Sequence, residues 1–236
     1  MEGSSAISTP VPTDEQQRLV RRAARALGRH GLAHAYGHCS VRLDQTSMLV
    51  CAALPMGQIP AGQDGVVVPI DGPLPEGVLG EVRLHQRIYQ TRPRIKGVCR
   101  TMPANLMTLS AFGRVPRPRH GMGTYFWPGP PLWPDVGLIR DDDTAGEAIR
   151  MMGSACALVM AGNGVVVCAD SLEKACVLTW FLEDAARIEL EAVRCGLADS
   201  MPMLAQDTAA RRATWSGGIA ERMWAYLTEG DPENAR

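Results

Sequence analysis

Apolar residues recur at three- and four-residue intervals in several stretches of the chain, and this spacing predicts amphipathic helices. The clearest follows Thr13, which forms the pattern of a capping box with Gln16, and precedes Gly31, a typical C-terminal stop. A second long helix is predicted between Ser171 and Gly196, which have the same two roles at its ends. The predicted helices cover residues 14–29, 79–91, 104–112, 143–152, 172–195 and 208–228.

Short apolar or alternating runs, bounded by polar turns and glycines, predict strands between these helices. The predicted strands cover residues 40–43, 47–51, 65–70, 95–101, 156–160 and 165–168. Asn163 lies between Gly162 and Gly164, which is a strong hairpin signal. The stretch 114–135 is rich in proline, glycine and aromatic residues, and connections of this length are often functional. We predict one α/β domain over residues 13–197, with a disordered tail at 1–12 and a helical extension at 198–236.

Composition narrows the class of protein. The 236 residues are 46% hydrophobic and 21% charged with a formal net charge of −1, so a large core is possible and a nucleic-acid partner is not expected. No window is apolar enough to span a membrane, and the start of the chain does not resemble a signal peptide, which predicts a cytoplasmic protein. The seven cysteines form no CxxC pair, which argues against a disulfide framework and a cysteine zinc site.

Four short segments follow one another in a recognisable order. They read GHCSVR from Gly37, LGEVRLH from Leu79, GVCRTMP from Gly97 and AGNG from Ala161. In order and spacing they resemble motifs of the class II aldolase/adducin family, which read GNxSxR, SSExxxH, AVVHTHP and RNHG. The resemblance extends over roughly residues 14–197. It implies an α/β protein with a three-layer α/β/α class II aldolase-like fold and a central, mainly antiparallel sheet.

The resemblance also implies a set of site residues. Glu81 occupies the position of the family's acid/base glutamate. His38 replaces an asparagine, and Ser40 and Arg42 match residues that help to bind the anionic end of the substrate. The two serines that often bind phosphate are replaced by an apolar residue and a glycine, which argues against a phosphorylated substrate.

The three histidines that hold the family's divalent metal are replaced by Arg100, Met102 and Asn163. Arginine has no acceptor and a permanent positive charge, so we expect no metal cofactor at this position. An alternative divalent site through Glu81, His85 and His120, or with His38, stays open.

Arg100 has two interpretations. Its guanidinium could bind a substrate carboxylate or stabilise a developing anion, or it could form a structural pair with Glu81. Asn163 could donate a hydrogen bond to substrate or serve only the turn. His120 and Tyr125, in the long loop, are candidate substrate contacts, and Cys99 is either a nucleophile activated by the neighbouring arginine or an inert strand residue.

These residues predict a lyase-type enzyme that cleaves a C–C bond in, or decarboxylates, a small aromatic or carboxylated substrate. Arg100 would bind the anion and Glu81 would transfer the proton, without the family's usual metal. The alternatives are a non-catalytic interaction module, as in adducin, and a specialised enzyme of secondary metabolism. The resemblance further implies a homo-oligomer, a tetramer, and the other expected partner is the small-molecule carboxylate substrate.

Overall fold

The strands of residues 10–234, the part of the chain that the computed structural model describes, form one open seven-stranded sheet. Every neighbouring pair is antiparallel except β5 and β6, which run parallel. The predicted mainly antiparallel sheet is therefore confirmed. Across the sheet the order is β3 (Val66–Pro69), β2 (Ser47–Val50), β1 (His38–Arg42), β4 (Gly97–Thr101), β7 (Val165–Ala169), β6 (Ala157–Met160) and β5 (Leu132–Trp133).

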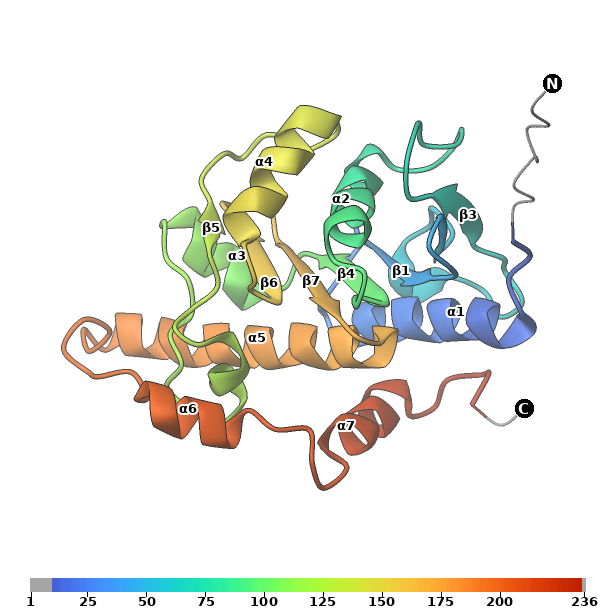
Figure 1. The fold of residues 1–236 in the computed structure, drawn as a ribbon. Coiled ribbons are helices and arrows are strands. Elements are labelled where there is room, and N and C mark those ends of the chain that lie inside the picture. Colours follow the sequence, from blue (N-terminus) through green and yellow to red (C-terminus); the bar gives the residue numbers. More distant parts are fainter. Residues whose placement is uncertain (1–9, 235–236) are drawn as a thin grey trace.

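Helices cover both faces of this sheet (Figure 1). The long helices α1 (Asp14–Arg29) and α5 (Leu172–Arg194) lie on one face, where α3 (Ala104–Ala111) packs against α5. On the opposite face lie α2 (Arg83–Thr91) and α4 (Asp142–Met152). The arrangement confirms the predicted three layers. No helix within residues 10–234 is both long and apolar enough to cross a membrane.

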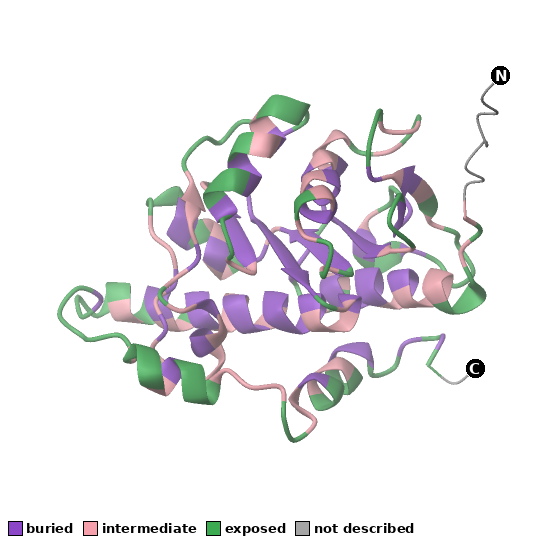
Figure 2. Cartoon of the chain, viewed as in Figure 1, coloured by how far each residue is buried: buried purple, intermediate pink, exposed green. Residues whose placement is uncertain are grey.

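Each face of the sheet has its own hydrophobic core, because successive strand residues point to opposite sides. On β4, Val98 belongs to the core under α2 and α4, whereas Cys99 belongs to the core against α1, α3 and α5. The five inner strands of the sheet are almost entirely buried, whereas the edge strands β3 and β5 are only partly buried (Figure 2). Arg100 therefore projects to the α2 and α4 side, away from Cys99.

Several predicted boundaries need correction. The segment predicted as one helix over 208–228 forms two, α6 (Gln206–Arg212) and α7 (Ile219–Thr228). Gly217 and Gly218 separate them with φ of 75° and 69°, values that no continuous helix permits. The predicted helix 79–91 begins as a 3-10 turn, η2 (Gly80–Val82), before α2. Two further 3-10 turns are η1 (Met56–Gln58) and η3 (Met122–Phe126). Most of the predicted disordered tail, residues 1–9, lies outside the described residues.

The C-terminal segment is fastened to α1 by buried ion pairs. The Arg25 guanidinium donates to Asp231 Oδ1 and Oδ2 at 2.7 and 2.8 Å and to Glu233 Oε2 at 2.6 Å. Arg21 donates to Glu233 Oε1 at 2.6 Å. These contacts hold the pKa of Glu233 at about 2, mainly through the hydrogen bond from Arg21. The residues after α7 thus form part of the same packed body.

Replacing Arg25 by alanine is expected to destabilise the fold by about 3 kcal/mol, the lower end of the range for a broken buried pair. The substitution removes one buried partner from each of two carboxylates, although Glu233 keeps its pair with Arg21 and Asp231 its pair with Arg29. Urea unfolding of the variant and the parent measures the difference. Arg211→Ala is the matched control, since its pair with Asp207 is 71% and 69% exposed and is expected to contribute little to stability. Equal effects of the two substitutions would contradict a structural role for the buried cluster.

Candidate active site

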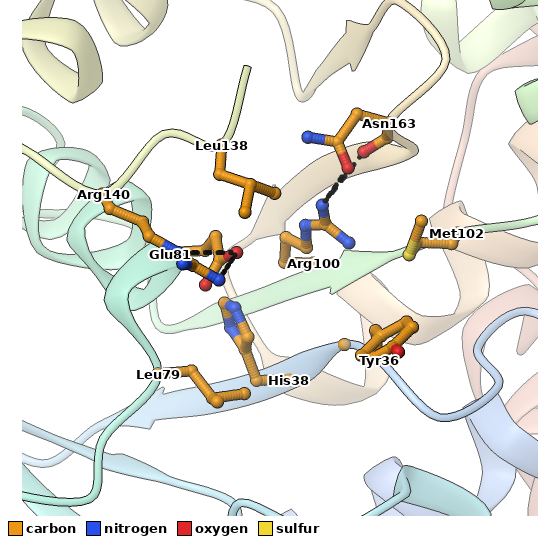
Figure 3. A pocket seen from close by; sticks show the side chains of 10 residues that line it. Tyr36, His38, Leu79, Glu81, Arg100, Met102, Leu138, Arg140 and Asn163 are labelled. Carbon is orange, nitrogen blue, oxygen red and sulfur yellow. Dashed lines mark hydrogen bonds and ion pairs between the residues drawn. The ribbon is translucent and has the colours of Figure 1, made fainter. Parts of the chain in front are cut away.

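The register between β1 and β4 brings two of the predicted site residues together. His38 pairs directly with Arg100 across the two strands, so both side chains project from the same face of the sheet. Both are buried, with 3% and 4% of their surface exposed. In Figure 3, His38 rises from β1 towards the space between Glu81 and Arg100.

Asn163 reaches the same place from the turn between β6 and β7. Arg100 Nη2 donates to its Oδ1 at 2.8 Å and to its backbone oxygen at 3.1 Å. The following residue, Gly164, has φ of 79°, and a Cβ there would lie 2.1 Å from the Thr101 carbonyl oxygen. A glycine is therefore required for the turn to approach β4 closely enough to orient the guanidinium.

Glu81 approaches from η2, on the other side of the guanidinium (Figure 3). Its carboxylate accepts from Nε of Arg140 at 3.2 Å, and the Arg140 side chain is 59% exposed. Among the described residues no ion pair joins Glu81 to Arg100. Burial lowers the pKa of Arg100, and the nearby charge of Glu81 partly opposes this effect. The structure thus favours an open arrangement over the closed Arg100–Glu81 pair considered above.

These side chains line a cavity of about 460 Å³, which is within the size range of small-molecule sites. Met102 lies on its wall beside Arg100 (Figure 3). Its remaining walls come from Tyr36, Gly37, Leu79, Leu138 and Arg140. A guanidinium, a carboxylate and an imidazole therefore face one apolar space, an arrangement that can bind an anion and transfer a proton.

A buried chain of hydrogen bonds leads away from the cavity. His38 Nδ1 lies 2.9 Å from His85 Nε2, and His85 Nδ1 lies 2.7 Å from Ser40 Oγ. Ser40 Oγ in turn lies 3.0 Å from the hydroxyl of Tyr89. Burial, together with the charge of Arg100, lowers the pKa of His85 to about 3, and burial holds the pKa of His38 well below its ordinary value. Both imidazoles are neutral at neutral pH.

These lowered pKa values predict sensitivity to acid. The unfolded chain takes up a proton at each histidine below about pH 6.5, whereas folded His85 takes one up only near pH 3. Stability is therefore expected to fall by about 1.4 kcal/mol per pH unit for each such histidine as the pH drops through this window. Urea unfolding between pH 7 and pH 4 measures the slope. His85→Gln should reduce it and the exposed-site control His34→Gln should not; an unchanged slope in His85→Gln would contradict the assignment.

A comparison with protein families agrees with the geometry. Residues 18–190 match the model of the Class II Aldolase and Adducin N-terminal domain. The chain belongs to this family. Two relatives are 3,4-dihydroxyphthalate decarboxylases. The one from Arthrobacter keyseri is 26% identical over 80% of this chain and 83% of its own length, and the one from Terrabacter sp. (strain DBF63) is 25% identical over 83% and 88%.

Solved structures of the class II aldolase family share the fold. The L-fuculose 1-phosphate aldolase from Glaciozyma antarctica PI12 superposes with a TM-score of 0.74 at 17% identity, over 93% of this chain and 94% of its own. An aldolase II superfamily protein from Pseudomonas syringae gives a TM-score of 0.74 at 21% identity, over 91% and 92% of the two chains. At these identities the likeness is one of architecture.

The donor set at the family's metal position does not fit a divalent cation. Arg100 places a positive charge there, Met102 offers only a soft thioether, and the side-chain oxygen of Asn163 is already bound by Arg100. The alternative set does not converge either: both ring nitrogens of His85 are bonded within the buried chain, and His120 lies 3.0 Å from Asp184 on α5. Within residues 10–234 no three or more His, Cys, Asp or Glu side chains form a metal-binding group.

The structure does not bring every predicted residue to the cavity. Ser40 is fully buried within the hydrogen-bonded chain. Arg42 points to another part of the surface, where it packs over the Tyr89 ring and donates to the carbonyl oxygens of Tyr89 and Ile95. Their positions in the motif gave no indication that they do not line the cavity.

Three other predicted candidates lie on the α5 side of the sheet. His120 contacts Asp184, and Tyr125 packs against Phe181. The long loop crosses to α5 through η3, so neither side chain reaches Arg100 within one chain. The Cys99 thiol is buried 3.7 Å from the thiol of Cys176, and burial raises its pKa well above the ordinary value. This environment is that of an inert strand cysteine.

Three cavity residues were not anticipated from the sequence, and one of them, Tyr36, directly precedes the segment that begins at Gly37. Arg140, which binds Glu81, lies just before α4, and Leu138 enters from the same segment. Neither falls in a motif of the family. The only available signal was their position shortly after the long loop, whose composition already indicated a functional region.

Proposed function

We propose that this lyase-type enzyme decarboxylates a small aromatic carboxylate and does so without a divalent metal. The observation that carries the proposal is the convergence of Glu81, His38 and Arg100 on one cavity, with the guanidinium oriented by Asn163. The two relatives named 3,4-dihydroxyphthalate decarboxylase support the reaction type. Membership of a family of aldolases, whose members include C–C bond-cleaving enzymes, supports the class.

Arg100 is the residue that we assign to binding the substrate carboxylate. One of its terminal nitrogens is held by Asn163, while its buried Nε has no partner among the described residues. A carboxylate that enters the cavity can accept from the remaining guanidinium donors, and such charge-assisted bonds are strong away from water. The apolar walls, which include Met102 and Leu138, fit the ring of an aromatic acid.

Glu81 is assigned the proton transfer. In the reaction the bond between the ring carbon and the carboxyl carbon breaks, carbon dioxide leaves, and the ring carbon takes up a proton. Glu81 passes a proton from the solvent at the cavity mouth to that ring carbon. The negative charge that develops on the ring lies close to Arg100, which stabilises it electrostatically.

The decisive assay measures carbon dioxide release from a panel of hydroxylated benzoates and phthalates by the purified protein. Release that requires Glu81 supports the proposal. A protein that binds none of these acids and changes none of them contradicts it, and would favour the alternative of a non-catalytic interaction module.

Metal dependence is tested separately. Elemental analysis of the purified protein is expected to find less than about 0.1 equivalent of zinc, iron or manganese, and treatment with a chelator is expected to leave turnover unchanged. The reason is the unsuitable donor set around Arg100. A stoichiometric, tightly bound metal whose removal abolishes turnover would disprove the metal-free version while leaving the decarboxylation intact.

We also propose that copies of the chain assemble, as a tetramer, around the cavity mouth. Tyr36, Leu79 and Leu138 line the cavity and are 67%, 40% and 51% exposed, so a second copy that covered them would bury apolar surface. Light scattering of the purified protein tests the assembly, and a monomeric mass would contradict it.

A further inference from the structure

One buried polar atom on the cavity wall is left without a partner. Nε2 of His38 makes no hydrogen bond to any described residue, although the residue is only 3% exposed and its other ring nitrogen is bonded to His85. An unpaired buried polar atom is costly. Because the ring projects between Glu81 and Arg100 (Figure 3), the missing partner is expected to come from a bound molecule.

The hydrogen-bonded chain determines whether this nitrogen donates or accepts. At its far end the Tyr89 hydroxyl donates to the backbone oxygen of Ser40 at 3.0 Å, and a carbonyl can only accept. With that proton committed, the bond between the two hydroxyls requires Ser40 to donate to Tyr89.

The same reasoning passes along the chain to the cavity. Since the Ser40 proton points to Tyr89, His85 Nδ1 must carry the proton of its bond to Ser40. His85 Nε2 is then bare, because the neutral ring has one proton, and it accepts from His38 Nδ1. His38 therefore keeps no proton on Nε2, which faces the cavity as an acceptor.

The cavity consequently presents an acceptor beside a donor. His38 offers the bare nitrogen, and its cross-strand partner Arg100 offers the unpartnered Nε–H. A carboxylate satisfies only the arginine, since it has no proton for the imidazole. A molecule with a carboxylate and a hydroxyl satisfies both.

We propose that His38 selects substrates that carry a hydroxyl group in addition to the carboxylate, and that Ser40, His85 and Tyr89 are positioning residues that fix its tautomer. The proposal rests on the proposed function for the carboxylate that Arg100 binds. It narrows the substrate class to hydroxylated aromatic acids whose hydroxyl donates to His38. The lowered pKa values of both histidines agree with it, because a protonated imidazole would be a donor.

Binding is measured by calorimetry with 2- and 3-hydroxybenzoate, the two matching methoxybenzoates and benzoate. A methoxy group has an oxygen but no proton to donate. In the parent protein at least one hydroxybenzoate is expected to bind roughly tenfold more tightly than its methoxy counterpart and than benzoate.

Tyr89→Phe tests the relay without touching the ligand. It removes the acceptor of the Ser40 proton, which then turns to His85 Nδ1 and reverses each bond along the chain. His38 would then present Nε2–H to the cavity, and the preference should be lost or inverted in favour of the methoxy compound. Tyr226→Phe, at a tyrosine that is 53% exposed, is the control and should keep the preference.

Nitrogen-15 spectra of histidine-labelled protein report the tautomer with no ligand present. In the parent protein His38 is expected to carry its proton on Nδ1 and none on Nε2. In Tyr89→Phe the proton is expected on Nε2 and not on Nδ1. A proton on Nε2 in the parent, or equal binding of hydroxy and methoxy compounds in the parent, would overturn the proposal. Binding of all five acids that is unaffected by Arg100→Gln would instead contradict the anion site of the proposed function.

Discussion

Glu81→Gln is expected to lower kcat by roughly 10²- to 10⁴-fold, the range for loss of a general acid or base. The amide is nearly isosteric and can still accept the hydrogen bond from Arg140, so the walls of the cavity should persist. Substrate affinity should therefore change only a few-fold. Carbon dioxide release gives kcat, and calorimetry with an unreactive benzoate gives the affinity.

Glu147→Gln provides the matched control, because this glutamate lies on α4 with a side chain that is 62% exposed. Its turnover should equal that of the parent. If Glu81→Gln retained full turnover as well, Glu81 would be only the ion-pair partner of Arg140, and the proton would have to come from another group.

Arg100→Gln is expected to weaken carboxylate binding by roughly ten- to two-hundredfold, as estimated for hydrogen bonds to a charged group. Arg100→Lys should recover only part of this loss, since an ammonium group keeps the charge but lacks the planar fork that bonds Asn163 and a carboxylate together. Calorimetry with benzoate compares both variants with the parent. The exposed Arg150→Gln is the control.

Arg100→Gln should leave the fold as stable as that of the parent protein, or more stable. The Arg100 charge is buried, its pKa is lowered by that burial, and no carboxylate of the described residues pairs with it. Removing such a charge relieves a desolvation cost. If Arg100→Gln binds benzoate more weakly but resists urea as well as the parent does, Arg100 serves binding and not stability. A large loss of stability would instead identify a structural arginine.

The motifs predicted the fold, and because they fix backbone positions they also predicted which of the site residues come together on one cavity. The roles of these residues stay a prediction. Arg100 and Asn163 meet because the strand and the hairpin turn that carry them are local structures with clear sequence signals. Glu81 lies in η2, at the start of the segment that was predicted as a helix. The two helices α6 and α7 were merged in the prediction because their apolar spacing continues past Gly217 and Gly218.

The direction of a buried side chain was harder to predict than its backbone. Ser40 follows His38 by two residues on the same strand and faces the same side. However, α2 covers Ser40, and its hydroxyl is hydrogen-bonded to His85. His120 and Tyr125 lie in a loop whose path depends on packing against α5, for which the sequence has no local signal. Arg140 was missed for the same reason.

The central position of β4 has a consequence for the order in which the protein becomes active. This strand lies between β1 and β7 and pairs antiparallel with both, and each of these two partners is distant from it in the sequence. Contacts of this kind form slowly, because long loops must close before they form. Helices α1 and α5 can reach native content while His38, Arg100 and Asn163 are still apart. During refolding, recovery of ligand binding should therefore lag behind recovery of helical signal, and it would report closure of the sheet.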